Sequence, residues 1–107
     1  MTHPTNGLDD TVHQRARLGI LAVLVEVKRA DFNHLKEVLE LTDGNLSRHL
    51  QTLEEARYVV IAKTFEGRRP RTWVSLTSAG GRALRSEVAA LRAVIGRVEG
   101  AQGVTQG

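Results

Sequence analysis

Residues 42–56 read TDGNLSRHLQTLEEA, and leucine recurs in this segment at positions 46, 50 and 53. Spacings of four and three residues place these side chains on one face of an α-helix. The three leucines should therefore face a core, and Thr42 or Asp43 can cap the amino end of the helix. The segment predicts a helix over residues 43–56 with one apolar and one polar face.

Two further helices are indicated on the amino-terminal side of this segment. Asp9 suits a first helical turn, and the helix expected over residues 9–27 carries apolar residues at helical spacing: Val12, Ala16, Ile20, Leu24 and Val27. Asp31 can cap a second helix, whose apolar stripe consists of Phe32, Leu35, Val38 and Leu39. The short connection from this second helix to residues 43–56 is typical of a helix-turn-helix.

After residue 56 the composition changes from helical to strand-like. Residues 59–65 and 72–77 are rich in β-branched and aromatic side chains. Residues 66–71, which lie between them, contain Gly67 and Pro70 and predict a loop, since proline suits a loop or edge position better than a central strand. Two strands around such a loop predict a β-hairpin.

A final helix is expected over residues 78–99, with Ser78 as its cap. About 22 residues at about 1.5 Å each span roughly 33 Å, whereas a domain of this size has a radius of gyration of about 13 Å. The far half of the helix should therefore extend past the core, where a second copy can cover it by two-fold symmetry. The alternative is a helix that folds back on its own core. The predicted dimer interface consists of apolar residues from the first and last helices: Val12, Ala16, Leu84, Val88, Leu91, Ile95 and Val98.

The predicted order is three helices, two strands and a helix, a mainly α fold with a β-hairpin wing. Three segments occur in the order found in winged helix-turn-helix regulators: DGNLSRHL (43–50) running on to LEEARYV (53–59), GRRPRT (67–72) and LTSAG (76–80). Over residues 10–95 the chain resembles the small single-domain regulators of the MarR/ArsR-like group. The resemblance implies a winged helix-turn-helix with a long C-terminal dimerisation helix, and a homodimeric transcription regulator, with repression as the expected effect.

Two positions depart from the family pattern. Arg57 stands where the family usually has glycine, just past the recognition helix, and glycine is preferred there because the position often needs a left-handed backbone. Gly81 stands where a basic residue is common. Arg57 must accept a left-handed backbone or the helix must end differently.

The polar face of residues 43–56 has the side chains that DNA readers use. Arginine can donate two hydrogen bonds to guanine, and Gln51 or Asn45 can pair with adenine. Ser47, Thr42 and the helix amino end can hold a phosphate. A plain solvated face is the alternative. The predicted recognition-helix contacts are Thr42, Gly44, Asn45, Ser47, Arg48, Gln51 and Thr52.

The predicted wing carries four cations against the single carboxylate of Glu66, which can orient a neighbouring arginine. Such a charge at a hairpin tip suits a minor groove or the adjacent phosphates. Basic residues on an edge can instead serve to deter aggregation. The predicted wing contacts are Lys63, Arg68, Arg69 and Arg71.

The composition fits one globular domain. The chain has 107 residues, of which 41% are apolar and 25% charged, with a net charge of +3. We expect flexible ends at residues 1–8 and 100–107 and a DNA-binding and dimerisation domain at residues 9–99. The first ten residues do not resemble a signal peptide, and the longest apolar run, residues 20–25, is far short of the about twenty that span a membrane. A cytoplasmic protein with no membrane partner is expected.

The sequence argues against catalysis and metal binding. Cysteine is absent, which excludes disulfides, thiolate zinc sites and a cysteine nucleophile. No pair among the four histidines has ligand spacing, so neither a metal nor a cofactor is expected, and His49 is interpreted as a packing or hydrogen-bonding residue. Trp73 is expected to pack across the wing, with a partner helix or a small ligand pocket as alternatives.

The residues bear on three classes of function. The favoured one is a sequence-specific regulator that binds double-stranded DNA at a palindromic site as a homodimer. A small-molecule effector of unknown identity could bind at the dimer interface. The alternative is a winged-helix protein–protein interaction module without specific DNA binding. An enzyme is disfavoured, because no nucleophile elbow, phosphate loop or catalytic triad is apparent.

Overall fold

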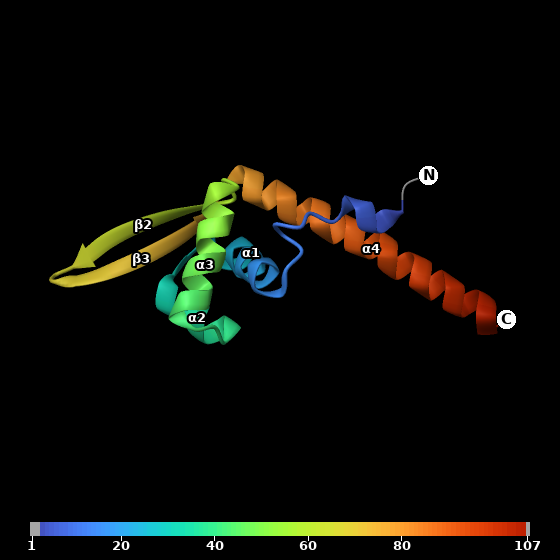
Figure 1. Cartoon of the computed structure of the whole chain (residues 1–107), viewed down its shortest axis with the longest axis horizontal. Helices are drawn as coiled ribbons and strands as arrows, with labels where there is room; N and C mark the ends of the chain where they lie inside the picture. Colours follow the sequence, from blue (N-terminus) through green and yellow to red (C-terminus); the bar gives the residue numbers. More distant parts are fainter. Residues whose placement is uncertain (1–2, 107) are drawn as a thin grey trace.

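The computed structural model describes residues 3–106 and, for residues 102–106, the backbone alone. These residues form a 3-10 helix, four α-helices and three strands, in the order η1 (Pro4–Gly7), α1 (Arg15–Val27), β1 (Arg29–Asp31), α2 (Phe32–Leu39), α3 (Asp43–Glu55), β2 (Val59–Glu66), β3 (Arg69–Leu76) and α4 (Ser78–Gln106). Figure 1 shows how the helices and the hairpin are arranged. The predicted winged helix-turn-helix is confirmed. Residues 1, 2 and 107 of the predicted flexible ends lie outside the described residues.

One apolar core joins the four α-helices to the sheet. The leucines at positions 46, 50 and 53 are at most 2% exposed and hold α3 on this core, as their spacing predicts. The remaining buried apolar members come from the turn before α1, the other helices and the strands: Val12, Ile20, Leu21, Leu24, Ala30, Leu35, Val59, Val74 and Leu84. The core therefore positions α3 with its polar face outward.

The sheet has the strand order β1-β3-β2, and all its pairs are antiparallel. β2 and β3 pair from Val59↔Leu76 to Glu66↔Arg69, so the strands are longer than predicted and the turn consists of Gly67 and Arg68 alone. Gly67 takes φ 65°, which glycine adopts without strain. β1 was not predicted, because three residues are too few to show alternation.

Pro70 lies in the central strand β3 rather than in the loop. β1 pairs with β3 only as far as Trp73, so at Pro70 the strand has a neighbour on one side, β2. Proline has no backbone N–H, but no neighbouring strand lies on the side of β3 away from β2 at this position, so no hydrogen bond to a strand is lost there. The prediction of a loop was wrong, but the edge environment that it required is present.

The first helix begins at Arg15, six residues later than predicted. Gln14 caps it by accepting a hydrogen bond from the Arg17 N–H at 3.0 Å. Asp9 instead organises a turn, because its carboxylate accepts from the Thr11 N–H at 2.9 Å and from the Tyr58 hydroxyl at 2.9 Å. These bonds to Asp9 take the place of the predicted first helical turn.

The helix-turn-helix is closed by side-chain and backbone caps. Asp31 caps α2, as predicted, by accepting from the His34 N–H at 2.7 Å, and Thr42 caps α3 by accepting from the Asn45 N–H at 3.1 Å. At the carboxyl end of α3, Arg57 accepts the left-handed backbone with φ 65°. Its N–H donates to the Glu54 carbonyl at 2.9 Å, and the Tyr58 N–H donates to the Leu53 carbonyl at 2.9 Å. This pair of bonds is the Schellman motif that glycine usually completes.

The last helix is capped by Thr77 rather than by the predicted Ser78. The Thr77 hydroxyl accepts from the Gly80 N–H at 2.9 Å and donates to the Arg57 carbonyl at 2.7 Å. Gly80 is required by close approach, since a Cβ at this position would lie 2.2 Å from the Tyr58 carbonyl oxygen. The segment LTSAG therefore joins α4 to the exit of α3.

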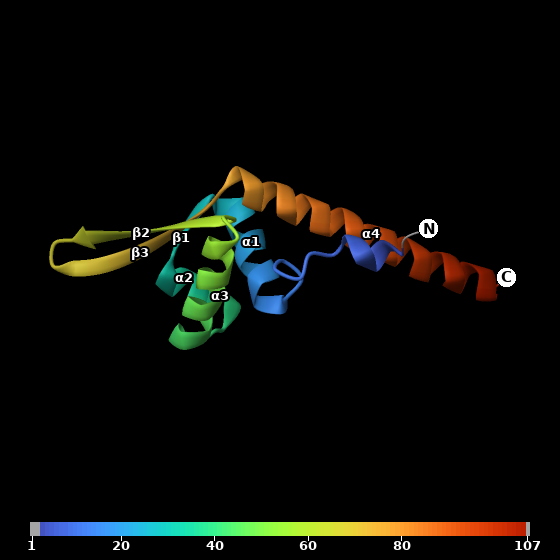
Figure 2. The ribbon, with the colours of Figure 1, turned by 45° about the horizontal axis from the view of Figure 1, so that its top comes forward.

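The molecule is elongated, because α4 projects from the core on the side opposite the wing (Figures 1 and 2). Its extents are 65 × 24 × 22 Å and its radius of gyration is 16.9 Å. α4 continues to Gln106 rather than ending near residue 99, because each added residue of an existing helix gains a backbone hydrogen bond. No helix in residues 3–106 is both long and apolar enough to cross a membrane.

The amino-terminal segment lies along α4 rather than forming a frayed end. η1 lies beside α4 (Figure 2) and packs against it. A Cβ at Gly7 would lie 3.3 Å from that of Ala90. Glu87 anchors this segment from a fully buried position on α4. Its carboxylate accepts from the Asp9 N–H at 3.1 Å and is 2.6 Å from the His13 Nδ1 atom. A buried carboxylate needs such partners, and they order residues 9–13.

Candidate nucleic-acid interface

The polar face of α3 is open to solvent. The side of the helix opposite the three buried leucines carries six exposed residues, which are Gly44, Asn45, Ser47, Arg48, Gln51 and Glu55. The Lys36 ammonium lies 2.9 Å from an Asp43 carboxylate oxygen and links α2 to the amino end of α3. The face is therefore both exposed and held in place, as a groove-reading helix requires.

The two threonines of the predicted recognition set are partly engaged within the helix. Thr42 is exposed, and its hydroxyl oxygen is the α3 cap. Thr52 is half-buried, and its hydroxyl donates to the Arg48 carbonyl at 3.2 Å. Gln51 keeps its amide at the surface, where it donates weakly to Glu55 at 3.4 Å. Arg48, Gln51 and Ser47 thus remain the best-presented candidates for base and phosphate contacts.

The wing extends this surface beyond the sheet. Lys63, Arg68 and Arg69 are exposed; Arg68 forms the turn with Gly67, and Arg69 is the first residue of β3. No core lies beneath the outer part of the hairpin, where β2 pairs with β3 alone. The hairpin projects away from the body of the protein (Figure 1), so its tip carries these charges away from the core.

Arg71 differs from the other three wing cations, because internal partners occupy it. Its guanidinium donates to Asp31 at 2.7 and 3.0 Å and to Glu66 at 2.6 Å, and hydrogen bonds to these two carboxylates raise its pKa. The backbone N–H of His34, together with Arg71, holds the pKa of the Asp31 carboxyl below its ordinary value. Arg71 is a brace between α2 and the wing, so its guanidinium is less available to DNA than those of Arg68 and Arg69, and its predicted DNA contact stays a prediction. The predicted role of Glu66 in orienting an arginine is confirmed.

Trp73 completes this brace. The Arg71 guanidinium lies 4.2 Å from the centre of its ring, and the Arg29 guanidinium lies 3.9 Å from that centre. Stacking of arginine on an aromatic face adds to the ion pair. The sequence suggested packing across the wing for Trp73, and the structure supplies the partners. The Arg29 contact was missed, because β1 was not predicted.

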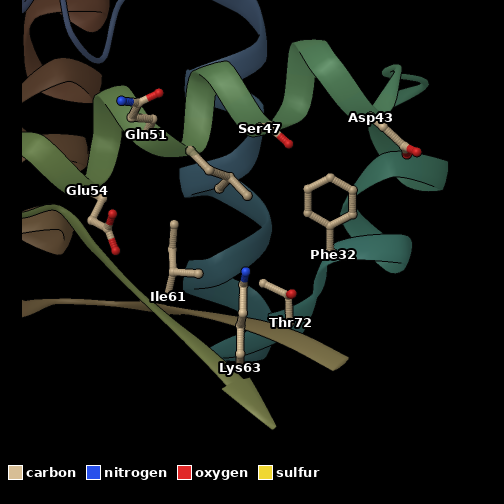
Figure 3. A pocket seen from close by; sticks show the side chains of 9 residues that line it. Phe32, Asp43, Ser47, Gln51, Glu54, Ile61, Lys63 and Thr72 are labelled. Carbon is tan, nitrogen blue, oxygen red and sulfur yellow. The ribbon is translucent and has the colours of Figure 1, made fainter. Parts of the chain in front are cut away.

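A cavity of about 450 Å³ separates the recognition helix from the wing (Figure 3). Ser47, Gln51 and Glu54 border it from α3, and Lys63 borders it from β2. Phe32, Leu50 and Ile61 form its apolar wall. The polar face of α3 and one face of the wing are therefore two walls of one recess.

The predicted dimer residues fall into two groups. Val12, Ala16 and Leu84 are at most 8% exposed within a single chain, so the core of the chain itself already covers them. This corrects their assignment to the interface. Val88, Ile95 and Val98 are 38%, 53% and 54% exposed on the projecting part of α4, and Leu91 is half-buried between them.

The side chains of His3, His13 and His49 make hydrogen bonds. His49 accepts from Arg17 Nη1 at 3.2 Å, and burial, followed by the charge of Arg17, lowers its pKa. This agrees with the hydrogen-bonding interpretation. In residues 3–106, no group of three or more His, Cys, Asp or Glu side chains could hold a metal ion. Glu87 was missed, because an isolated glutamate in a helical pattern gives no sign of burial.

Residues 16–95 match a family model described as a winged helix DNA-binding domain. A protein of Methanocaldococcus jannaschii that is named as uncharacterized is 40% identical over 72 residues, which cover 67% of this chain and 78% of that protein. The resemblance that the sequence segments indicated is thereby confirmed.

Two solved structures are similar in fold. A transcriptional regulator homologue from Pyrococcus horikoshii OT3 is 31% identical, with a TM-score of 0.83 over 92% of this chain and 98% of that chain. A MarR family transcriptional regulator from Streptomyces coelicolor, solved in complex with DNA, is 24% identical, with a TM-score of 0.60 over 96% of this chain and 75% of that chain. The second likeness is one of fold alone.

Proposed function

The chain belongs to the winged helix DNA-binding domain family, and on that premise we propose that it is a homodimeric transcription regulator. It binds a palindromic site in double-stranded DNA and acts in the cytoplasm as a repressor. The observation that carries the proposal is the exposed polar face of α3 beside an exposed cationic wing tip. An interaction module without DNA binding has no need of this combination.

The side chains of α3 and of the wing suit different contacts with DNA. Arg48 and Gln51 reach base edges in the major groove, where bidentate hydrogen bonds discriminate one base pair from another. Arg68 and Arg69 contact phosphates and supply affinity that depends on salt. Ser47 and the amino end of α3 add a phosphate contact that fixes the register.

The dimer is supported by the projecting part of α4. Val88, Ile95 and Val98 are spaced seven and three residues apart and are exposed. An apolar stripe of this kind is covered most simply by the same stripe of a second copy. Two copies then present two α3 helices to one palindrome, about one helical turn of 34–36 Å apart.

Fluorescence anisotropy with the upstream region of its own gene tests the proposal. A scrambled duplex is the control, and salt is varied from about 50 to 200 mM, a range in which six to ten phosphate contacts change affinity by about 10³–10⁵. We expect tight, salt-dependent binding that prefers the upstream region. Absence of binding to either duplex at low salt contradicts DNA binding and favours the protein-interaction module.

Substitutions in α3 distinguish contacts with bases from nonspecific electrostatic attraction to DNA. Arg48→Ala should cost about 1–3 kcal/mol on the preferred site and less on unrelated DNA. Arg82→Ala removes an equal charge from the exposed outer side of α4 and should leave the preference unchanged. An equal loss on both duplexes for Arg48→Ala contradicts its role in reading bases.

A further inference from the structure

Phe65 has an unusual position for an aromatic residue. It is 71% exposed, the largest fraction among the exposed large apolar side chains of the described residues. It pairs across the hairpin with Pro70, which is also exposed, one row before the tip. A phenylalanine at such a place does not contribute to the core, and its exposure to water is unfavourable.

The wing places Phe65 well outside the sheet. The four outer rows, from Lys63↔Thr72 to Glu66↔Arg69, lie past the last pair that β1 makes with β3. Four rows at about 3.3 Å each extend roughly 13 Å. The minor groove lies half a helical turn, or roughly 17 Å, from the major groove along the duplex. The projection suits a hairpin that reaches one groove while α3 occupies the other.

Strand alternation places Phe65 on the face of the wing that adjoins the recognition helix. Lys63 is two residues away and therefore shares its face, and Lys63 lines the recess opposite Ser47 and Gln51 of α3 (Figure 3). Glu66 and Arg71, on the other face, are bonded to each other at 2.6 Å. The apolar side chain and the DNA-facing side of α3 thus border the same space.

The charges around Phe65 favour a polyanionic partner. Three exposed cations lie within four residues of Phe65 along the chain: Lys63 shares its face, Arg68 lies in the turn, and Arg69 lies at the tip on the opposite face, where it pairs with Glu66. The carboxylate of Glu66 is compensated by Arg71. An apolar ring among cations fits a minor groove, where proteins place phenylalanine or proline against the sugars and base steps while cations contact phosphates. An apolar protein surface would match the ring but not the cations.

We propose that Phe65, backed by Pro70, enters the minor groove next to the major groove bound by α3. There it contacts the deoxyribose walls, and Arg68 and Arg69 hold the flanking phosphates. The inference rests on the proposed DNA-binding function and adds a contact whose contribution to affinity is independent of salt. The wing would then bind DNA through an apolar contact as well as through its cations.

The test compares Phe65→Ala with Val60→Ala and Arg68→Ala on the preferred duplex. Burying a phenylalanine is worth about 1.5–3 kcal/mol, so Phe65→Ala should weaken binding about 10-fold to 100-fold with an unchanged salt slope. Val60 is 54% exposed on the same strand but on the other face, and its truncation should leave affinity unchanged. Arg68→Ala should reduce the salt slope by about one.

Hydroxyl-radical cleavage of the bound duplex locates the contact, because this reagent attacks sugars from the minor groove. Wild-type protein should protect sugars half a turn from the α3 site, and Phe65→Ala should lose that protection while the α3 site stays occupied. Unchanged affinity or unchanged protection in Phe65→Ala overturns the inference, as does a salt slope that falls with the affinity. If the wild type fails to bind any duplex, the proposed function itself is wrong.

Discussion

The two halves of α4 have the same apolar spacing but opposite surroundings. In the first half, Leu84 and Glu87 are buried where α4 packs against α1 and the amino-terminal segment. In the second half, Ile95 and Val98 are more than half exposed, at 53% and 54%. The apolar residues at positions 84, 88, 91, 95 and 98 recur at spacings of four and three residues. The comparison shows that such a pattern indicates which face of a helix is apolar but not what covers that face. Paired substitutions in the two halves test this difference.

The largest difference is expected between Leu84→Ala and Ile95→Ala. Leu84→Ala should lower the free energy of unfolding by about 2–5 kcal/mol, since it opens a cavity in the core. Ile95→Ala should change it only through the proposed dimer, so its effect should grow with protein concentration. Urea unfolding at two protein concentrations measures both effects. If the two variants lose equal stability at low concentration, the second half of α4 is covered within one chain.

A second pair tests the buried carboxylate at the boundary between the halves. Glu87→Gln keeps the size of the side chain but loses the charge that faces His13, and should cost about 1.5–3 kcal/mol, the value of a hydrogen bond to a charged group. Glu99→Gln, at an exposed position further along the helix, should stay within about 0.5 kcal/mol of wild type. Thermal unfolding of the three proteins at neutral pH measures the difference. Equal stability of both variants would mean that Glu87 does not anchor residues 9–13.

Two glycines of the helix should respond to alanine with opposite signs. Gly80→Ala places a Cβ 2.2 Å from the Tyr58 carbonyl oxygen and should destabilise by about 1–3 kcal/mol. No atom lies within 4 Å of a Cβ at Gly96, so Gly96→Ala should stabilise by up to about 1 kcal/mol through helix propensity. Circular dichroism melts report both changes. A destabilising Gly96→Ala points instead to a close partner at that position, such as the second subunit.

The smallest expected effect is the pH dependence of the free energy of unfolding that arises from His49 in α3. Burial lowers the pKa of His49 from 6.5, so the unfolded chain takes up a proton before the folded chain does. Stability should therefore be full above about pH 6.5 and decrease as the pH falls below it. Unfolding curves from about pH 7.5 to 5.5 should show a larger loss for wild type than for His49→Gln. Ile95→Ala should retain the wild-type dependence, and an equal pH dependence in His49→Gln contradicts the effect.

Much of the fold and part of the site could be predicted from local patterns. The leucines of α3, the Asp31 and Thr42 caps and the polar recognition face depend on residues within one turn of a helix. Arg71 could not be distinguished from Arg68 and Arg69, because its partner Asp31 lies 40 residues away. The assignment of Arg48, Gln51 and the wing cations to DNA contacts stays a prediction.

Spacing and residue type were enough to predict the four α-helices, the apolar face of each and the position of the cationic hairpin, but not where α1 begins or where α4 ends. Tertiary structure alone decided which of those residues are free to bind. Packing brings Glu87 to Asp9 across 78 residues and Tyr58 to Asp9 across 49 residues, and it leaves Phe65 and Ile95 uncovered. The physical reason is that burial and pairing depend on how distant segments share one core, which no local pattern records.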